Sequence, residues 1–422
     1  MRDLKILPNR RGSGIYTKSS HPVRYGVYTE VHIGSYTFHY NLKGQIKTII
    51  GTGNNWPHPA EWLKRTAANN WVYYSTGRYY TGSFDLLGEY YLPCTAYPTN
   101  ILDQENPFSR PAVQAALDMA AGMPASFSKL RGSVDRRTTA PDLCAFLDQA
   151  ENQNPGRLKN EAVELHDILG APITVLPPDC RLVDYDVVPI ILTEGCLYNC
   201  HFCRVKTPTP FTKRSRENVD RQLLRLKGFF GPDLVNYNSV FFGQHDALAA
   251  SPELIIYTAQ RAYDFLEIAG SYMQGPRLFL FGSVDSFLEK KEDFFLALNR
   301  LPWHVHINLG LESFDNTTLA MLGKPLAAEK IKQTFVRSMA LNRRLPNLTV
   351  SVNFVLGEQL PASHLAALDR LLDDRTIPFT SRTTLYLSPL IGSKDSGLLL
   401  DQFRQIKRKS RLETYLYLIQ RL

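Results

Sequence analysis

The chain has 422 residues, of which 44% are hydrophobic and 21% are charged, a composition typical of a soluble protein with a large core and two or three domains. It contains no run of about 18 apolar residues and no apolar segment of signal-peptide length after Met1, so we expect a cytoplasmic protein with no membrane span. The net charge of +8 permits an anionic partner such as a nucleic acid, but the charges are scattered, which favours an ordinary solvated surface.

The first half of the N-terminal region is predicted to be mainly β-structure. Residues 1 to about 20 are basic and rich in Gly and Ser, and we expect them to form a loose arm. The segments 27–33, 36–40 and 45–50 carry strand-forming residues separated by turn residues, which predicts a β-hairpin or small meander. Pro59–Arg65 is predicted to be a short helix with proline near its start.

Residues 71–97 are dense in aromatic side chains, and we expect strands whose rings pack into a core rather than a surface that stacks bases. The tyrosines of this segment are Tyr73, Tyr74, Tyr79, Tyr80, Tyr90, Tyr91 and Tyr97. Residues 107–170 are predicted to be mainly helical. Cys94, Cys144 and Cys180 share no motif spacing and are interpreted as buried thiols.

Three of the six cysteines form a triplet with the spacing C-x3-C-x2-C: Cys196, Cys200 and Cys203. The run 187–192 before them is predicted to be a buried strand, and the prolines within 207–210 exclude a helix after them. The triplet therefore lies on a loop at the end of a strand, where ligands bind in α/β sheets. Four thiolates would complete the coordination of a zinc ion or of every iron in an iron–sulfur cluster. Three thiolates leave one coordination position open on the metal centre.

Two other uses of the triplet were weighed. His201 could supply a fourth ligand for structural zinc, but it lies between two cysteines, where its side chain should point away from a shared metal. A disulfide is disfavoured because a triplet leaves one thiol over and no secretory signal is present.

From residue 187 onward, strands alternate with helices. Strands are expected at 187–192, 239–242, 277–281, 305–309, 348–355 and 383–387. Helices are expected from Ser215 and at 252–269, 292–298, 316–322, 327–341 and 362–372. Six such units with right-handed crossovers predict an α/β fold, a partial (β/α)6 parallel barrel preceded by an N-terminal α+β domain.

Three regions follow from this pattern. Residues 1–178 form an N-terminal β-meander plus a helical region, which we expect to shape the substrate site. Residues 179–392 form the core that carries the cysteines, and residues 393–422 form a C-terminal helical tail. The boundary at 178 is marked by Pro177-Pro178-Asp179.

The cysteine triplet, with Phe202 directly before the third cysteine, resembles the cluster loop of the radical S-adenosylmethionine (radical SAM) enzymes. A second segment agrees with it in order: Gly310-Leu311-Glu312-Ser313, followed by Leu322-Gly323-Lys324. This segment is common in the branch that contains methylthiotransferases, elongator-type tRNA enzymes and oxygen-independent coproporphyrinogen oxidases. The resemblance covers about residues 185–392. It implies a 4Fe-4S cluster bound by Cys196, Cys200 and Cys203, with the fourth iron chelating S-adenosylmethionine.

The resemblance also implies positions that bind S-adenosylmethionine: Gly243, Asp246, Glu312, Ser313, Lys324, Gly357 and Ser388. Gln244 and His245 depart from the Gly-Gly-Glu-like turn of the family, which leaves open which residue contacts the methionine ammonium. Other interpretations remain for some of these side chains. Asp246 and Glu312 could be helix N-caps, and Lys324 could be merely solvated.

The activity implied by the resemblance is radical chemistry. A reduced cluster passes an electron to S-adenosylmethionine, and the resulting 5′-deoxyadenosyl radical removes hydrogen from a substrate that the sequence does not identify. The implied partner is an electron donor such as flavodoxin or ferredoxin. No cysteine follows Cys203, so no C-terminal auxiliary cluster is expected. The alternative is a non-catalytic metal-binding protein (Fe-S or zinc) with a nucleic-acid or scaffold role, which only the departure at Gln244 and His245 favours.

Overall fold

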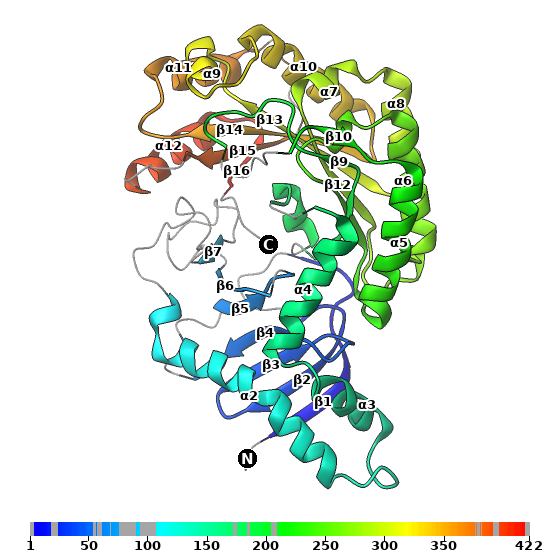
Figure 1. Ribbon diagram of the computed structural model, residues 1–422. Helices are drawn as coiled ribbons and strands as arrows, with labels where there is room; N and C mark the ends of the chain where they lie inside the picture. Colours follow the sequence, from blue (N-terminus) through cyan, green and yellow to red (C-terminus); the bar gives the residue numbers. More distant parts are fainter. Residues whose placement is uncertain are drawn as a thin grey trace.

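Two large sheets, one antiparallel and one parallel, make up the described part of the protein (Figure 1). The computed structural model describes residues 4–17, 24–53, 56, 61–67, 69–75, 90–92, 107–171, 175–183, 186–203, 209–375, 377, 380, 382–390 and 396–417. The antiparallel sheet with helices α2 and α3 occupies one end of the molecule, and the parallel sheet with its helices occupies the other (Figure 1). None of the described helices is both long and apolar enough to cross a membrane.

The N-terminal sheet is a seven-stranded meander whose strands follow one another in sequence order. Its strands are β1 (Lys5–Arg11), β2 (Val27–Ile33), β3 (Tyr36–Tyr40), β4 (Ile46–Gly51), β5 (Glu61–Arg65), β6 (Trp71–Ser75) and β7 (Tyr90–Leu92). The predicted meander is therefore confirmed. It is longer than expected, because two segments that we did not predict as strands belong to it.

The first of these segments corrects the predicted loose arm. Lys5–Arg11 forms β1, which pairs antiparallel with β2 from Lys5 opposite His32 to Arg11 opposite Val27. Ile6 packs against the core, which local composition does not reveal. Residues 1–3 and 18–20 of the predicted arm lie outside the described residues.

The second correction concerns the helix predicted at Pro59–Arg65. Glu61–Arg65 is strand β5, paired with both β4 and β6, and residues 59 and 60 lie outside the described residues. Leu63 is fully buried between Ile49 and Tyr73 of the neighbouring strands. Sheet pairing on both sides thus overrides the local helix signal.

Three helices follow the meander and confirm the helical prediction for 107–170: α2 (Pro111–Ser133), α3 (Pro141–Ala150) and α4 (Pro155–Leu169). The ring of Tyr40 meets Phe127 of α2 at 5.7 Å and Phe146 of α3 at 5.3 Å, both edge to face. Such buried aromatic contacts fix the helices on the sheet.

The aromatic segment forms strands β6 and β7, as predicted, and the Tyr73 side chain is fully buried. Cys144 and Cys180 are buried free thiols, also as predicted. Tyr79, Tyr80, Tyr97 and Cys94 lie outside the described residues.

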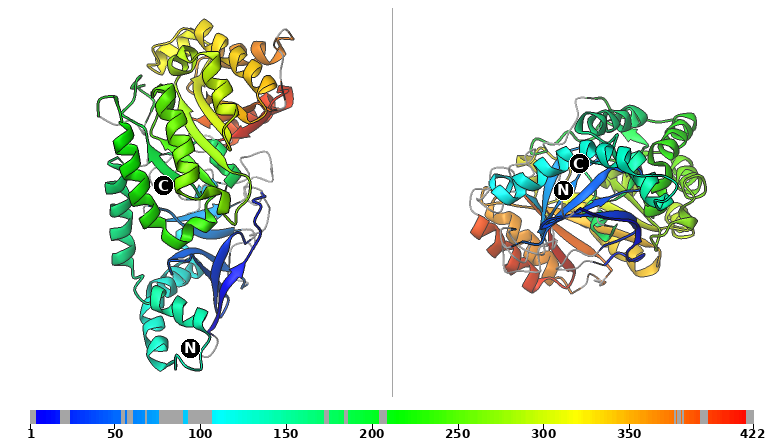
Figure 2. Two further views of the ribbon diagram at one scale, coloured as in Figure 1. Left: turned by 90° about the vertical axis from the view of Figure 1, so that its right-hand side faces the viewer. Right: turned by 90° about the horizontal axis from the view of Figure 1, so that it is seen from below.

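The second sheet confirms the predicted parallel α/β fold. Its order is β16-β15-β14-β13-β12-β11-β8, and every described pairing in it is parallel. The strands are β8 (Val188–Ile191), β11 (Ser239–Gly243), β12 (Arg277–Gly282), β13 (His304–Glu312), β14 (Leu348–Leu356), β15 (Thr384–Pro389) and β16 (Glu413–Leu416). The helices between and after them are α5 (Arg216–Phe230), α6 (Pro252–Phe265), α7 (Val284–Glu289), α8 (Glu292–Asn299), α9 (Asn316–Met321), α10 (Ala328–Arg344), α11 (Ala362–Asp373) and α12 (Ser396–Lys409). These helices cover the outer side of the sheet (Figure 2).

The tail predicted to be helical needs one correction. Helix α12 is present, but Glu413–Leu416 after it forms β16, a seventh strand that pairs with β15. Four residues are too few to show a strand pattern in the sequence. Short helix α7 was missed for the same reason.

Alternate residues of the central strands carry polar groups on one face of the parallel sheet. Asn308 of β13 donates a hydrogen bond to Ser351 of β14 at 2.7 Å. The 3-10 segment η3 (Pro178–Val183) lies against this row, and its buried Asp179 accepts hydrogen bonds from Ser351 at 2.5 Å and from Tyr386 of β15 at 2.9 Å. The segment that leads into β8 is thereby fixed to the inside of the sheet.

Strand β8 is the edge strand that leads into the cysteine loop, and helix α5 covers its open edge. The Gln222 side chain accepts a hydrogen bond from the Ile191 N–H at 2.8 Å and donates one to the Ile191 carbonyl at 2.9 Å. Gln222 is 2% exposed. One side-chain amide therefore replaces the missing neighbouring strand at the last residue before the loop.

We predict that Gln222→Leu lowers the free energy of unfolding by about 2–6 kcal/mol, because two buried backbone groups lose their partner at about 1–3 kcal/mol each. Urea unfolding followed by circular dichroism measures the loss. Arg221→Leu, one residue earlier on the exposed side of α5, is the matched control and should stay within about 0.5 kcal/mol of the wild type. Equal midpoints for the two variants would contradict the role assigned to Gln222.

Candidate functional site

The cysteine loop begins where β8 ends, at the carboxyl edge of the parallel sheet. Residues Thr193–Glu194 (β9) pair with Thr212–Lys213 (β10), so both ends of the loop are held together. Gly195 has φ +82°, and a Cβ there would lie 2.6 Å from the Thr209 carbonyl oxygen. Only glycine fits where the chain turns into the loop.

Three contacts fix this loop across the ends of other strands. The Tyr198 hydroxyl donates a hydrogen bond to Asp285 Oδ2 at 2.7 Å and accepts one from the Asp285 N–H at 3.0 Å. The His201 N–H donates to the Leu322 carbonyl at 2.9 Å. Phe202 packs against a small apolar cluster made of Leu322, Val355 and Leu390. The loop is thus attached to Asp285 after β12, to Leu322 after β13, to Val355 near the end of β14 and to Leu390 after β15.

The three thiols share one electrostatic neighbourhood. Cys200 is buried, whereas Cys196 and Cys203 are partly exposed. Burial raises the pKa of the Cys200 thiol to about 11; Lys324 opposes that rise, and Glu312 and the other two thiols add to it. A metal centre, which binds thiolates, would supply the positive charge that this buried thiol lacks.

A single metal ion and an iron–sulfur cluster require different arrangements of the thiolates. Within the described ranges, no three His, Cys, Asp or Glu side chains converge on one metal-ion position. In an iron–sulfur cubane each cysteine binds a different iron, so the thiols need not converge on one point. The His201 ring lies directly against Gly323.

Glu312 and Lys324 form a buried pair beside the cysteines. Lys324 Nζ donates to the Gly310 carbonyl at 2.7 Å and lies 3.4 Å from Glu312 Oε1 and 5.3 Å from the centre of the Tyr198 ring. The Lys324 side chain is 4% exposed, so it is not a merely solvated lysine. Burial raises the pKa of Glu312, and Lys324 partly opposes this rise.

Glu312 is not a helix N-cap. The N-cap of α9 is Asp315, whose side chain accepts from the Thr318 N–H. Glu312 itself has φ +67°, an uncommon backbone conformation for a residue with a side chain, at the point where β13 ends. Such strained positions cluster at binding sites.

Asp246, at the carboxyl end of β11, has one oxygen engaged and one left over. Oδ1 accepts from the Ser283 N–H at 3.1 Å and from the Ser286 hydroxyl at 2.8 Å, and so supports the N-terminus of α7, whose N-cap is Ser283. Oδ2 is buried with no hydrogen-bond partner among the described residues, as is Nε2 of His245. Burial raises the pKa of Asp246 and lowers that of His245 to about 4. Buried polar groups normally have hydrogen-bond partners, and a bound polar ligand would supply the missing ones here.

The remaining predicted positions differ in their surroundings. Gly243, Gly357 and Ser388 lie at the carboxyl ends of β11, β14 and β15, on the same edge as the cysteine loop. Ser313 is fully buried, and its hydroxyl bonds His364 Nδ1 of α11 at 2.8 Å. That hydroxyl is therefore engaged with a helix rather than with the cysteine loop.

Sequence reasoning missed two parts of the site. Tyr198 and Asp285 are 87 residues apart, and no local pattern joins them. Gly323 was noted only as part of a motif. It has φ +66°, and a Cβ there would lie 2.6 Å from Cγ of His201, so the loop rests on this glycine.

We predict that Gly323→Ala pushes the His201 ring, and with it the loop, out of place. Iron bound per chain after anaerobic reconstitution should fall, and stability should drop by about 1–2 kcal/mol from the left-handed backbone alone. Gly228→Ala is the matched control, since its Cβ would meet nothing within 4 Å in the last turn of α5. It should keep wild-type iron and gain about 0.5–1 kcal/mol. Wild-type iron and stability in Gly323→Ala would contradict this role.

Comparison with known proteins gives a family match for the region that contains most of the second sheet. Residues 190–372 match the sequence model of the radical SAM superfamily. This range begins in β8, contains the cysteine triplet and ends in α11. No curated protein sequence matches the chain.

Several solved structures are similar to part of the chain, with low identity and low TM-scores. A radical SAM methyltransferase from Sphaerobacter thermophilus is 15% identical, with 55% of this chain and 65% of that chain covered and a TM-score of 0.37. The cobalamin-dependent S-adenosylmethionine radical enzyme OxsB, in its apo form, is 20% identical over 53% of this chain and 30% of its own, with a TM-score of 0.31. OxsB with aqua-cobalamin and S-adenosylmethionine bound is 18% identical over 54% and 31%, with a TM-score of 0.33.

The chain spans less than two thirds of the length of each of these structures, and the assignment depends on the family match, not on them. The family match favours an enzyme of unidentified substrate over the zinc and non-catalytic alternatives. Residues 190–372 thus match the radical SAM superfamily, whose enzymes use a 4Fe-4S cluster and S-adenosylmethionine.

Proposed function

We propose that this enzyme cleaves S-adenosylmethionine reductively at a single 4Fe-4S cluster held by Cys196, Cys200 and Cys203, and then removes a hydrogen atom from its substrate. One observation carries the proposal. The three thiols lie on a loop that is fixed at three points over the carboxyl edge of a parallel sheet. The other two cysteines in the described residues, Cys144 and Cys180, are buried elsewhere and share no loop with them.

The cofactors supply the difficult chemistry when bound: one electron enters S-adenosylmethionine, and breaking its C–S bond gives methionine and a 5′-deoxyadenosyl radical. This chain's residues position the cofactors and exclude water. Phe202 and its apolar cluster close the loop against the ends of β14 and β15. Tyr198 and the His201 backbone fix where the thiols lie.

Two carboxylates are proposed to contact S-adenosylmethionine. The unfilled Oδ2 of Asp246 is suited to accept a hydrogen bond from the methionine ammonium, in a place where the departure at Gln244 and His245 leaves no other acid. Glu312 and Lys324 offer an acceptor and a cation to the ribose and the methionine carboxylate. The strand ends at Gly243, Gly357 and Ser388 are proposed to line the rest of the cofactor, with backbone close to the adenine at Gly357.

The substrate is proposed to bind at the same carboxyl edge of the parallel sheet. Radical SAM enzymes need a reductant, and flavodoxin or ferredoxin is the proposed electron donor. A nucleic-acid substrate and the methylthiotransferase-containing branch remain predictions from the sequence.

We predict that wild-type protein holds about four irons per chain, the content of one cubane cluster. Reduced with dithionite and given S-adenosylmethionine, it should release 5′-deoxyadenosine. Each of Cys196→Ala, Cys200→Ala and Cys203→Ala should lose the cluster and release none. Cys144→Ala, Cys180→Ala and His201→Ala should keep both, because these side chains are not ligands. Zinc in the wild type, loss of metal in His201→Ala, or about eight irons per chain would refute the proposal.

A second set of variants separates cofactor binding from cluster assembly. Asp246→Asn and Glu312→Gln should keep the iron but bind S-adenosylmethionine about tenfold or more weakly, since a charged hydrogen bond contributes about 1.5–3 kcal/mol. Ser313→Ala is the control: it should lower stability, because His364 loses its partner, and leave the dissociation constant unchanged. Anaerobic calorimetric titration measures the dissociation constant, and urea unfolding measures the stability. If Ser313→Ala weakens binding as much as Asp246→Asn, the assignment of these contacts is wrong.

A further inference from the structure

Basic side chains gather on the inner face of the parallel sheet, near the amino ends of its strands. His304 and His306 of β13 lie on the same face as Asn308, because side chains two residues apart in a strand point the same way. Arg277 begins β12 opposite His304, and its Nη1 lies 2.9 Å from His306 Nε2. With one residue of η3, these side chains form a group that we call the inner basic cluster: Arg181, Arg277, His304 and His306.

The two arginines of the inner basic cluster have neutral partners. The Arg277 guanidinium donates to His306, and Arg181 Nε donates to the Tyr386 hydroxyl at 3.2 Å. Arg181 also lies over the ring of Tyr415, 4.2 Å from its centre. In the part of the chain that the structure describes, no carboxylate lies within ion-pair distance of either guanidinium. Both arginine side chains are partly exposed, so a ligand from solvent can reach them.

His306 carries a hydrogen-bond donor without an acceptor. Burial lowers the pKa of its imidazole, and His304, Arg277 and Arg181 lower it further, so the ring is neutral. Since an arginine can only donate, His306 Nε2 accepts the bond from Arg277, and the proton of the ring lies on Nδ1. Nδ1 is buried and has no partner among the described residues. Only one ring carbon separates Nδ1 from Nε2, so an acceptor beside Arg277 would also be close to this donor.

Among the described residues, every charged side chain that acts on the two histidines is a cation. Burial lowers the pKa of His304 to about 4, and Arg277 and Arg382 add to this shift. For His306 the corresponding cations are Arg277 and Arg181. The electrostatic potential at the two imidazole rings is therefore positive.

Asp179 and Glu413 are the acids beside the cluster, and they leave it positive. Asp179 accepts hydrogen bonds from Ser351 at 2.5 Å and from Tyr386 at 2.9 Å, and burial raises its pKa, which favours its neutral form. Glu413 is exposed and lies 3.5 Å from the Tyr415 hydroxyl. Even with both acids counted as charged, two carboxylates accompany three guanidinium groups, those of Arg181, Arg277 and Arg382.

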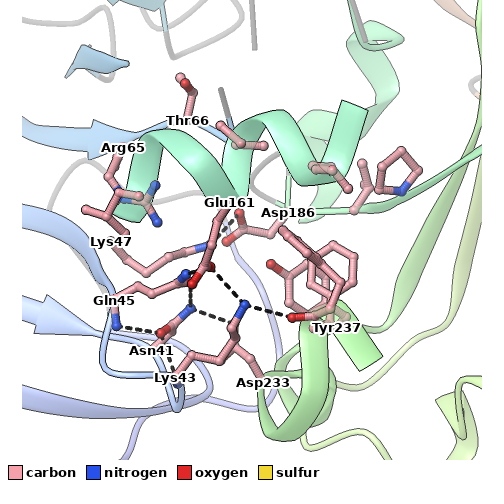
Figure 3. A pocket seen from close by; sticks show the side chains of 18 of the residues that line it. Asn41, Lys43, Gln45, Lys47, Arg65, Thr66, Glu161, Asp186, Asp233 and Tyr237 are labelled. Carbon is pink, nitrogen blue, oxygen red and sulfur yellow. Dashed lines mark hydrogen bonds and ion pairs between the residues drawn. The ribbon is translucent and has the colours of Figure 1, made fainter. Parts of the chain in front are cut away.

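Two lysines between the two sheets are paired, in contrast to these arginines. In the cavity of about 110 Å³ that lies there, Lys47 is 3.4 Å from Asp186 and Lys43 is 3.0 Å from Glu161 (Figure 3). A charged group that is partly removed from water without a charged partner is destabilising. A bound anion would supply that partner to the arginines of the inner basic cluster.

We propose that Arg181 and Arg277 bind one oxyanion, a carboxylate or a phosphate group, and that His306 donates to it from Nδ1. Planar guanidinium groups suit the paired oxygens of both anions, and a neutral imidazole N–H adds one more donor. His306 lies six residues before Glu312 on β13, a separation of about 20 Å at about 3.3 Å per residue. The site is therefore separate from the residues proposed to bind S-adenosylmethionine.

Equilibrium dialysis of the full-length, anaerobically purified protein tests the proposal. Labelled inorganic phosphate and labelled acetate are the probes, each at an ionic strength held constant with chloride. The wild type should bind at least one of them saturably, at one ion per chain. Binding of phosphate alone, of acetate alone or of both would support the proposal and identify the group that the site takes. Saturable binding of neither ion would overturn it.

Three variants locate the site. Arg277→Gln should weaken the binding about tenfold or more, since it removes a charged donor. Arg181→Gln should do the same, and it serves as the second variant if Arg277→Gln does not fold. His306→Phe keeps an aromatic ring beside Phe279, which stacks on His306 at 5.0 Å, but it lacks Nδ1 and should also weaken the binding. Wild-type binding by a folded form of any of these variants would contradict the proposal.

Arg261→Gln is the matched control, since Arg261 lies on helix α6 and pairs with Asp220 at 3.3 Å. It should bind the anion as the wild type does. Equal weakening in Arg261→Gln would overturn the proposal, because the net charge of the protein would then explain the binding. Iron content should equal that of the wild type in every variant, because none of the substituted residues contacts the cysteine loop. The outcome of this test is thus independent of the proposed function.

Discussion

The pair of hydrogen bonds between Gln222 and Ile191 determines where the cysteine loop can start. Ile191 ends the edge strand β8, and an edge strand exposes backbone groups that would otherwise fray or pair elsewhere. With both groups held by α5, the chain leaves the sheet at a fixed point and in a fixed direction. The contacts of Tyr198, His201 and Phe202 can then place three thiols over the strand ends.

The two ends of the parallel strands carry different chemistry. The carboxyl edge holds buried acids, Asp246 and Glu312, whose pKa values are raised by burial and which suit a cationic or hydrogen-bond-donating ligand. The amino edge meets the N-terminal sheet through Lys47 and Lys64, which both pair with Asp186. The N-terminal sheet thus brings its own charged residues to the parallel sheet, away from the cysteines.

Local sequence signals sufficed for much of the fold. Six strands of the parallel sheet were predicted from apolar runs followed by amphipathic helices. The pattern of each strand and helix can be recognised from the residues of that segment alone. Strands β1, β5 and β16 were missed because pairing with distant residues stabilises them. The site divides in the same way. The cysteine spacing is local and was predicted, whereas the hydrogen bond between Ser313 and His364 joins residues 51 apart, which no local pattern reveals.

The central claim is that one cluster has an iron without a protein ligand. Electron paramagnetic resonance of the dithionite-reduced protein tests it most directly, before and after addition of S-adenosylmethionine. The proposal predicts the signal of a single reduced 4Fe-4S cluster whose g values shift when S-adenosylmethionine binds, and a splitting from nitrogen when the cofactor is labelled at its amino group. A cluster signal that S-adenosylmethionine leaves unchanged would contradict the proposal, because every iron would then already have its full set of ligands.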